Sequence, residues 1–189
     1  MHLGDGAQAS SDASRSRWGR PIRTVGEREG SRVDDDLARQ LLDIEEIKNL
    51  KARYFRLLDA KQWSGWTDVF SEDLEFVYAD PSVMNVPPNA TPTPEGAMVG
   101  RDELIAFVSA AMESVTTIHH GHMAEITLVD ADTARGRWGL TNHCEFQDAE
   151  GSAHWLHGYG HYDEQYVRAD DGWRIRRSVF YRRDMGPPT

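Results

Sequence analysis

The chain has 189 residues, 39% of them hydrophobic, which is enough for one compact domain with a core. Asp and Glu number 31 against 21 Lys and Arg, so the formal net charge is −10 at pH 7. Such a surface repels nucleic-acid backbones and anionic membranes, and we expect neither as a partner. Cys144 cannot form an internal disulfide because it is the single cysteine, and no apolar run is long enough for a signal segment or a membrane span. These features predict a cytoplasmic protein.

Residues 1–35 are rich in Gly, Ser and Arg and hold almost no periodic apolar residues. Such a composition cannot bury enough surface to fold, so we predict a disordered N-terminal tail. One domain is expected over residues 36–185, followed by a short C-terminal tail at residues 186–189.

A long amphipathic helix is predicted at the start of the domain. Apolar residues recur at spacings of three and four and form one stripe: Leu37, Leu41, Ile44, Ile47, Leu50, Tyr54 and Leu58. Asp59 stands near the C-terminus of this helix, where the helix dipole disfavours a carboxylate unless a local group compensates. A functional role explains this misplaced charge, and a solvated helix end is the alternative. On the dipole argument alone, Asp59→Asn should leave the fold intact or slightly more stable.

The next segments mix helix, strand and loop. Trp63 and Trp66 indicate a second short helix, residues 74–78 alternate as a strand, and residues 101–114 have the pattern of a helix. Residues 80–100 hold five of the eight prolines and are predicted to form a long loop that covers an apolar pocket.

Four predicted strands complete the domain, at residues 116–129, 133–147, 153–168 and 172–183. Short turns rich in Asp separate them, so we expect antiparallel neighbours. Helices followed by a long antiparallel meander indicate an α+β fold with helices on one face of a curved sheet.

Three histidines fall within four residues near the start of the first of these strands, namely His119, His120 and His122. By alternation His119 shares a face with Met123, whereas His120 and His122 point the other way. Histidine exchanges protons near neutral pH, so His119 is the leading candidate for a general base, with an ordinary core or surface histidine as the alternative. His120 and His122 have no clear third ligand, so we predict no metal site.

Histidines on the next two strands have less certain orientations. Alternation places His143 with Arg135 and Arg137 on a solvated or subunit-facing surface, although one β-bulge would turn it into the pocket. His161 shares a face with Tyr159 and is a candidate wall residue of the pocket.

Two separated motifs resemble a known family. The first is DIEEIKNLKARYFRLLD, from Asp43 to Asp59, and the second is HHGHMAEIT, from His119 to Thr127, followed by TARGRW. The region from about Leu41 to Arg183 resembles the SnoaL-like branch of the nuclear-transport-factor-2-like α+β cones. Within this branch the motifs are most similar to the bacterial bile acid 7α-dehydratases, with features of scytalone dehydratases.

The resemblance implies a cone in which N-terminal helices pack on a curved mixed, mostly antiparallel sheet. The catalytic residues that it implies are Tyr54, Asp59, His119 and Arg182. In this arrangement Asp59 holds the second ring nitrogen of His119, and the scytalone dehydratases would add Tyr78 and His143. Leu58 stands where those enzymes carry a tyrosine, so the chain combines features of both groups and its substrate stays open.

These features predict a cofactor-independent dehydratase that eliminates water from a hydrophobic, polycyclic or steroid-like hydroxy compound by His/Asp general base catalysis. Five residues are expected to contact the substrate: Trp63, Tyr78, Met123, His143 and His161. A polyketide cyclase or isomerase of the same fold is the first alternative. A non-catalytic binding module, such as the β subunit of a ring-hydroxylating dioxygenase, is the second.

A homotrimer or another small homo-oligomer is also expected. Trp138, Leu140 and Phe146 share one parity of a predicted strand and could form an exposed apolar face between subunits.

Overall fold

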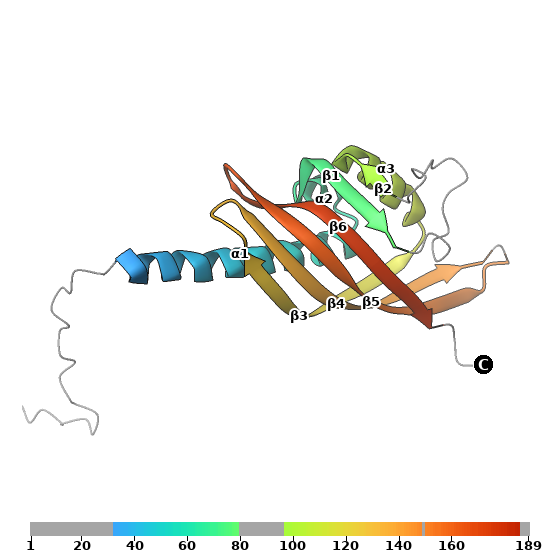
Figure 1. The fold of residues 1–189 in the computed structure, drawn as a ribbon. Coiled ribbons are helices and arrows are strands. Elements are labelled where there is room, and N and C mark those ends of the chain that lie inside the picture. Colours follow the sequence, from blue (N-terminus) through green and yellow to red (C-terminus); the bar gives the residue numbers. More distant parts are fainter. Residues whose placement is uncertain (1–31, 80–96, 149, 186–189) are drawn as a thin grey trace, which may run out of the picture.

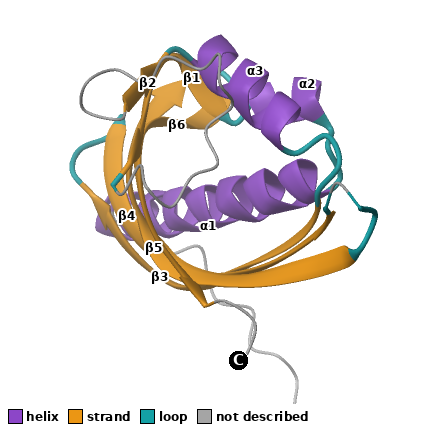
Figure 2. Ribbon diagram, turned by 90° about the vertical axis from the view of Figure 1, so that its right-hand side faces the viewer, coloured by secondary structure: helices purple, strands orange, loops and turns teal. Residues whose placement is uncertain are grey.

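The computed structural model describes residues 32–79, 97–148 and 150–185. A curved, open sheet of six strands wraps around one long helix, and two shorter helices lie beside it (Figures 1 and 2). The helices are α1 (Arg32–Asp59), α2 (Trp63–Thr67) and α3 (Arg101–Ala111). The strands are β1 (Phe70–Tyr78), β2 (Ala97–Val99), β3 (Thr116–Leu128), β4 (Thr133–Gln147), β5 (Ala153–Ala169) and β6 (Gly172–Met185).

The strands follow the order β2-β1-β6-β5-β4-β3 in the sheet. Strands β3 to β6 form an antiparallel meander, and β1 pairs with β6 in parallel. The predicted α+β class, with helices on a curved mixed, mostly antiparallel sheet, is therefore confirmed. The ends of the four meander strands lie within two residues of those expected from the sequence.

Two predicted boundaries need comment. Residues 32–35, which we assigned to the disordered tail, already belong to α1, while the rest of that tail lies outside the described residues. The predicted loop at residues 80–100 ends in the short strand β2, which pairs with β1. The proposed covering role of this loop concerns residues 80–96, which also lie outside the described part, as does the C-terminal tail at 186–189.

Alternation along β4 decides which side chains reach the core. Ala134, Trp138 and Leu140 face the helices and are 2%, 7% and 2% exposed, whereas Arg135 and Arg137 face solvent. The expectation that Trp138 and Leu140 form an exposed subunit face is therefore wrong. Trp138 and Leu140 do share a face, but that face belongs to the core there, whereas Phe146 near the end of the strand is 39% exposed.

Polar contacts of Asp43 connect helix α1 to the sheet. Asp43 forms an ion pair of 2.7 Å with Arg168 of β5, and the indole nitrogen of Trp173 on β6 donates to the same carboxylate over 3.4 Å. Leu37 and Leu41, at the start of the predicted apolar stripe, are 54% and 56% exposed. The stripe is buried only farther along, because the N-terminal turns of α1 project past the sheet (Figure 1). None of the described helices is long and apolar enough to cross a membrane.

Candidate active site

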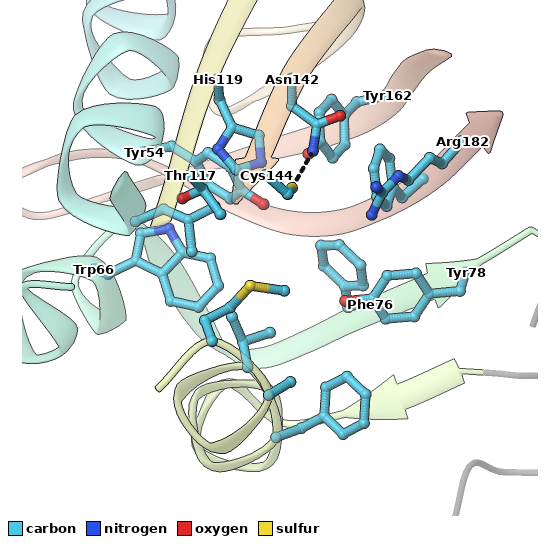
Figure 3. Close-up of a pocket in the computed structure, with 16 residues that line it drawn as sticks. Tyr54, Trp66, Phe76, Tyr78, Thr117, His119, Asn142, Cys144, Tyr162 and Arg182 are labelled. Carbon is cyan, nitrogen blue, oxygen red and sulfur yellow. Dashed lines mark hydrogen bonds between the residues drawn. The ribbon is translucent and has the colours of Figure 1, made fainter. Parts of the chain in front are cut away.

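A cavity lies between α1, α3 and the inner face of the sheet (Figure 3). Its volume is about 50 Å³. The surface that its wall exposes is mostly apolar or aromatic. The polar and sulfur-bearing side chains that line it are Tyr54, Tyr78, Met112, Thr117, His119, Asn142, Cys144, Tyr162 and Arg182. Such a cavity, apolar with a few convergent polar groups, is the usual form of a small-molecule site.

The structure brings Asp59 and His119 together. Nδ1 of His119 lies 2.6 Å from Oδ1 of Asp59, and the His119 side chain is only 9% exposed. Because Nδ1 faces the carboxylate, it carries a proton, and Nε2 is the ring nitrogen left to act as a base. His119 lines the cavity and Asp59 does not, so the carboxylate acts from behind the histidine. Asp59 lies about 140° around the helix from Tyr54, so the two side chains cannot both face the cavity. Asp59 can still affect the chemistry at the cavity, because it acts through His119.

Asp59 is held by more than the histidine ring. Its Oδ2 accepts the backbone N–H of His119 over 2.9 Å, and its Oδ1 accepts the Thr117 hydroxyl over 2.8 Å. Burial alone would raise the pKa of Asp59, but the hydrogen bonds from His119 and Thr117 outweigh it and lower the pKa below its ordinary value. These donors supply the local compensation that the end of α1 lacks, so the charge of Asp59 is stabilised in the folded protein.

The ring of His119 has an aromatic support. Phe55 stacks on it with ring centroids 5.8 Å apart and an interplanar angle of 11°. Gly121, two residues along β3, makes room for this ring, since a Cβ there would come within 2.6 Å of Phe55 Cε2. The glycine of the His-His-Gly-His motif therefore allows the packing that orients the general base candidate.

Three tyrosines from three elements converge on the cavity: Tyr54 of α1, Tyr78 of β1 and Tyr162 of β5. Burial raises the pKa of each of them well above its ordinary value. A side-chain hydrogen bond links Tyr54 and Tyr162, and the charge of Arg182 from β6 opposes part of the rise in the pKa of Tyr78 and Tyr162. All three hydroxyls therefore remain protonated at physiological pH and can donate hydrogen bonds.

A buried ion pair lies under the tyrosines. Nζ of Lys51 contacts Glu164 Oε1 at 2.6 Å, and both side chains are 0% exposed. The same ammonium lies 3.5 Å from the ring centroid of Tyr162 and 4.1 Å from that of Tyr54. Burial lowers the pKa of Lys51, and the attraction of Glu164 works against this shift. The pair joins α1 to β5 and lies against the rings of Tyr54 and Tyr162.

The residues predicted to contact substrate divide into two groups. Tyr78 lines the cavity, but His143 and His161 lie on the outer face of the sheet, where they stack on Trp155 and Tyr181. Alternation explains this result, because the strand stays regular through His143 and no bulge reverses it. The prediction that these two histidines contact substrate is therefore corrected.

Two further predicted contacts also fall outside the cavity. Met123 is 95% exposed, because the register of β3 shifts between Gly121 and Ala124 and breaks its alternation with His119. Trp63 packs edge-on against Trp66 at 5.9 Å, and only Trp66 reaches the cavity wall.

Sequence reasoning missed Asn142 and Tyr162. Both side chains face the cavity, and each residue is the sequence neighbour of a histidine that faces outward. Asn142 precedes His143, and Tyr162 follows His161, so alternation along the strand puts them on the inner face. The signal that could have found them is this parity, once the inner face of the sheet is known. Among the described residues, no group of three or more His, Cys, Asp or Glu side chains is arranged to hold a metal ion.

The fold and the site together define a class: nuclear-transport-factor-2-like α+β cones with a histidine and aspartate pair at an internal cavity. A family model, the SnoaL-like domain, matches residues 39–179, and the chain belongs to this family. A protein of Gibberella zeae named as a probable cyclase is 24% identical over 127 residues, which are 67% of this chain and 82% of the relative.

Solved structures share the same fold. One is named as a candidate scytalone dehydratase from Novosphingobium aromaticivorans, with a TM-score of 0.65, 18% identity, and coverage of 81% of this chain and 93% of that chain. Another, from Kribbella flavida, has a TM-score of 0.65, 20% identity, and coverage of 77% and 95%. The particular similarity to bile acid 7α-dehydratases stays a prediction.

Proposed function

We propose that the protein is a cofactor-independent dehydratase, a lyase that removes water from a hydrophobic hydroxy compound, with polycyclic and steroid-like compounds as the expected class. One observation carries this proposal. The His119 and Asp59 pair stands at a largely apolar cavity that also receives three protonated tyrosines and the charge of Arg182. An elimination needs such a base, a donor for the leaving hydroxyl and a charge for the developing oxyanion.

The reaction starts at the carbon next to a carbonyl group. Nε2 of His119 accepts a proton from this carbon, and the electron pair of the broken C–H bond moves to the carbonyl oxygen, where Arg182 stabilises the enolate. Asp59 stabilises the imidazolium that forms, as the carboxylate of a serine protease triad does for its histidine. The electrons then form the C=C bond while the C–O bond of the β-hydroxyl breaks. This hydroxyl takes the proton from His119 and leaves as water, with Tyr54 or Tyr162 donating a hydrogen bond to it.

The volume of the cavity bears on substrate entry. Sites for drug-sized ligands usually enclose roughly 300–1,000 Å³, whereas this cavity encloses about 50 Å³. A compound of two or more rings therefore enters only when part of the wall moves. Phe107 of α3 and Met112, directly after the end of α3, are the adaptable part, because both are only partly buried and α3 rests on the edge of the sheet.

The proposal is tested with 3-hydroxy-1-tetralone, a small bicyclic β-hydroxy ketone that forms 1-naphthol when it loses water. We expect 1-naphthol fluorescence to rise with the wild-type protein and to fall by at least about 10³-fold in rate with His119→Ala. His161→Ala, a histidine on the outer face of the sheet, is the matched control and should keep the full rate. Equal rates in wild type and His119→Ala would refute the proposal.

A cyclase is the second candidate, and the name of the Gibberella zeae relative favours it. The same base can take a proton from carbon and form an enolate that attacks an internal carbonyl, with no leaving group. The two functions differ in one result. A cyclase would exchange the proton next to the carbonyl of a ketone with solvent in a His119-dependent way, yet would form no 1-naphthol from the hydroxy ketone.

A further inference from the structure

Asn142 presents a buried amide oxygen at the cavity. The residue lies on β4, is 5% exposed and lines the cavity wall (Figure 3). Its Nδ2 donates to Cys144 Sγ over 3.3 Å. Its Oδ1 accepts no hydrogen bond from any residue that the structure describes. Buried amide oxygens are nearly always satisfied, so an exception beside a cavity calls for a donor from the cavity side.

A glycine on the neighbouring strand sets the surroundings of this oxygen. Gly158 of β5 pairs with Asn142, and a Cβ on Gly158 would overlap Oδ1 of Asn142. The same Cβ would lie 2.9 Å from Nε of Arg182. The amide oxygen and the guanidinium nitrogen therefore both lie within 3 Å of the point that a side chain at position 158 would occupy. The nearby positive charge also favours the amide orientation in which oxygen, and not the NH2 group, points to Arg182.

We propose that Oδ1 of Asn142 accepts a hydrogen bond from a hydroxyl group of the bound compound beside Arg182, and that the site therefore prefers compounds with such a donor. The proposal rests on the proposed function only in taking this cavity as the substrate site. An amide oxygen has lone pairs and no proton, so it distinguishes an alcohol or phenol from an ether, a carbonyl or a fluoride of similar size. Asn142 is thus a specificity-determining residue, and it stands one position before the histidine that the sequence resemblance indicated.

The test is a binding cycle that needs no turnover. The probes are 1-naphthol and 1-fluoronaphthalene, which differ in the hydroxyl donor, and their Kd values are measured by calorimetry with wild type and Asn142→Leu. We expect wild type to bind 1-naphthol about tenfold or more tightly than the fluoride, and Asn142→Leu to reduce this ratio to about one by weakening 1-naphthol alone. Thr141→Val, on the opposite face of the same strand, is the control and should keep the wild-type ratio.

Three results would overturn the proposal. The first is an unchanged ratio in Asn142→Leu, which would assign the hydroxyl to another group such as His119 or Tyr78. The second is a ratio of about one already in wild type, and the third is no binding of 1-naphthol up to its solubility limit. A thermal melt checks folding, and Asn142→Leu should melt at or above the wild-type temperature because it removes a buried unsatisfied oxygen. If Asn142→Leu abolishes the preference for 1-naphthol but the wild-type protein forms no 1-naphthol from the hydroxy ketone, the dehydratase proposal is rejected and the role of Asn142 in binding is retained.

Discussion

The substitution Asp59→Asn changes both the charge and the proton position of the pair. In wild type, the carboxylate accepts three hydrogen bonds, from the ring and backbone N–H groups of His119 and from the Thr117 hydroxyl. An asparagine cannot accept all three, because one of its two polar atoms is a donor. If its oxygen keeps the backbone N–H, its NH2 group faces Nδ1 of His119. The ring must then carry its proton on Nε2, and the nitrogen at the cavity is no longer a base.

The expected loss follows from this tautomer. An equivalent change in a serine protease triad lowers kcat by about 10⁴, so we expect a loss of roughly 10³- to 10⁴-fold in kcat for 1-naphthol formation. The fold should lose about 1–2 kcal/mol, since charge-assisted hydrogen bonds become neutral ones. This reverses the expectation from the helix dipole alone, which left Asp59→Asn neutral or stabilising.

The pH dependence of stability provides an independent check. The pKa of Asp59 lies below its ordinary value of 3.8 in the folded protein, so its charge stabilises the fold above that pH. This contribution disappears as the pH falls through the folded pKa, where wild-type Asp59 is protonated. Denaturant unfolding should therefore show a stability gap between wild type and Asp59→Asn at pH 7 that closes below about pH 3.8. A variant as stable as wild type at pH 7, or a full kcat, would refute the reasoning.

Four other predictions follow from the site and its surroundings. Lys51→Met should destabilise the fold by about 3–5 kcal/mol in denaturant unfolding, because it leaves Glu164 buried without its cation, and the double variant with Glu164→Leu should recover most of this loss. His143→Ala and His161→Ala should leave kcat/KM unchanged, since both lie on the outer face of the sheet; a tenfold loss would place them in the reaction. Tyr54→Phe should lower kcat by about 10²-fold with little change in KM, if its hydroxyl acts on the leaving group. Light scattering should give a multiple of the 21.4 kDa chain mass, and a monomer at micromolar concentration would contradict the predicted homo-oligomer.

Periodicity in the sequence predicted the meander well and the inner face of the sheet poorly. Strands are found where alternation and turn residues indicated them, because both signals are local. Which parity enters the core depends on where the helices pack, and that is a tertiary property. Trp138 and Leu140 were therefore assigned to the wrong environment although their shared face was predicted correctly.

The sequence predicted the histidine and aspartate pair of the candidate site, but not most of the residues that line the cavity around it. The resemblance to a family supplied Asp59 and His119, and the structure places them in contact. It also pointed to His143, where the inward residue is its neighbour Asn142, because a shift of one residue along a strand changes the face. The Lys51 and Glu164 pair carried no local signal, since its two members lie far apart in the sequence and meet only after α1 packs on β5.

The central claim is that Nε2 of His119 takes a proton from carbon. The most direct measurement is proton NMR of 1-tetralone in D₂O, which follows deuterium exchange at the carbon next to the carbonyl and requires no leaving group. We predict that wild type accelerates this exchange, that His119→Ala and Asp59→Asn return it to the buffer rate, and that His161→Ala keeps it. Exchange at the buffer rate with wild type, or equal acceleration by wild type and His119→Ala, would contradict the claim.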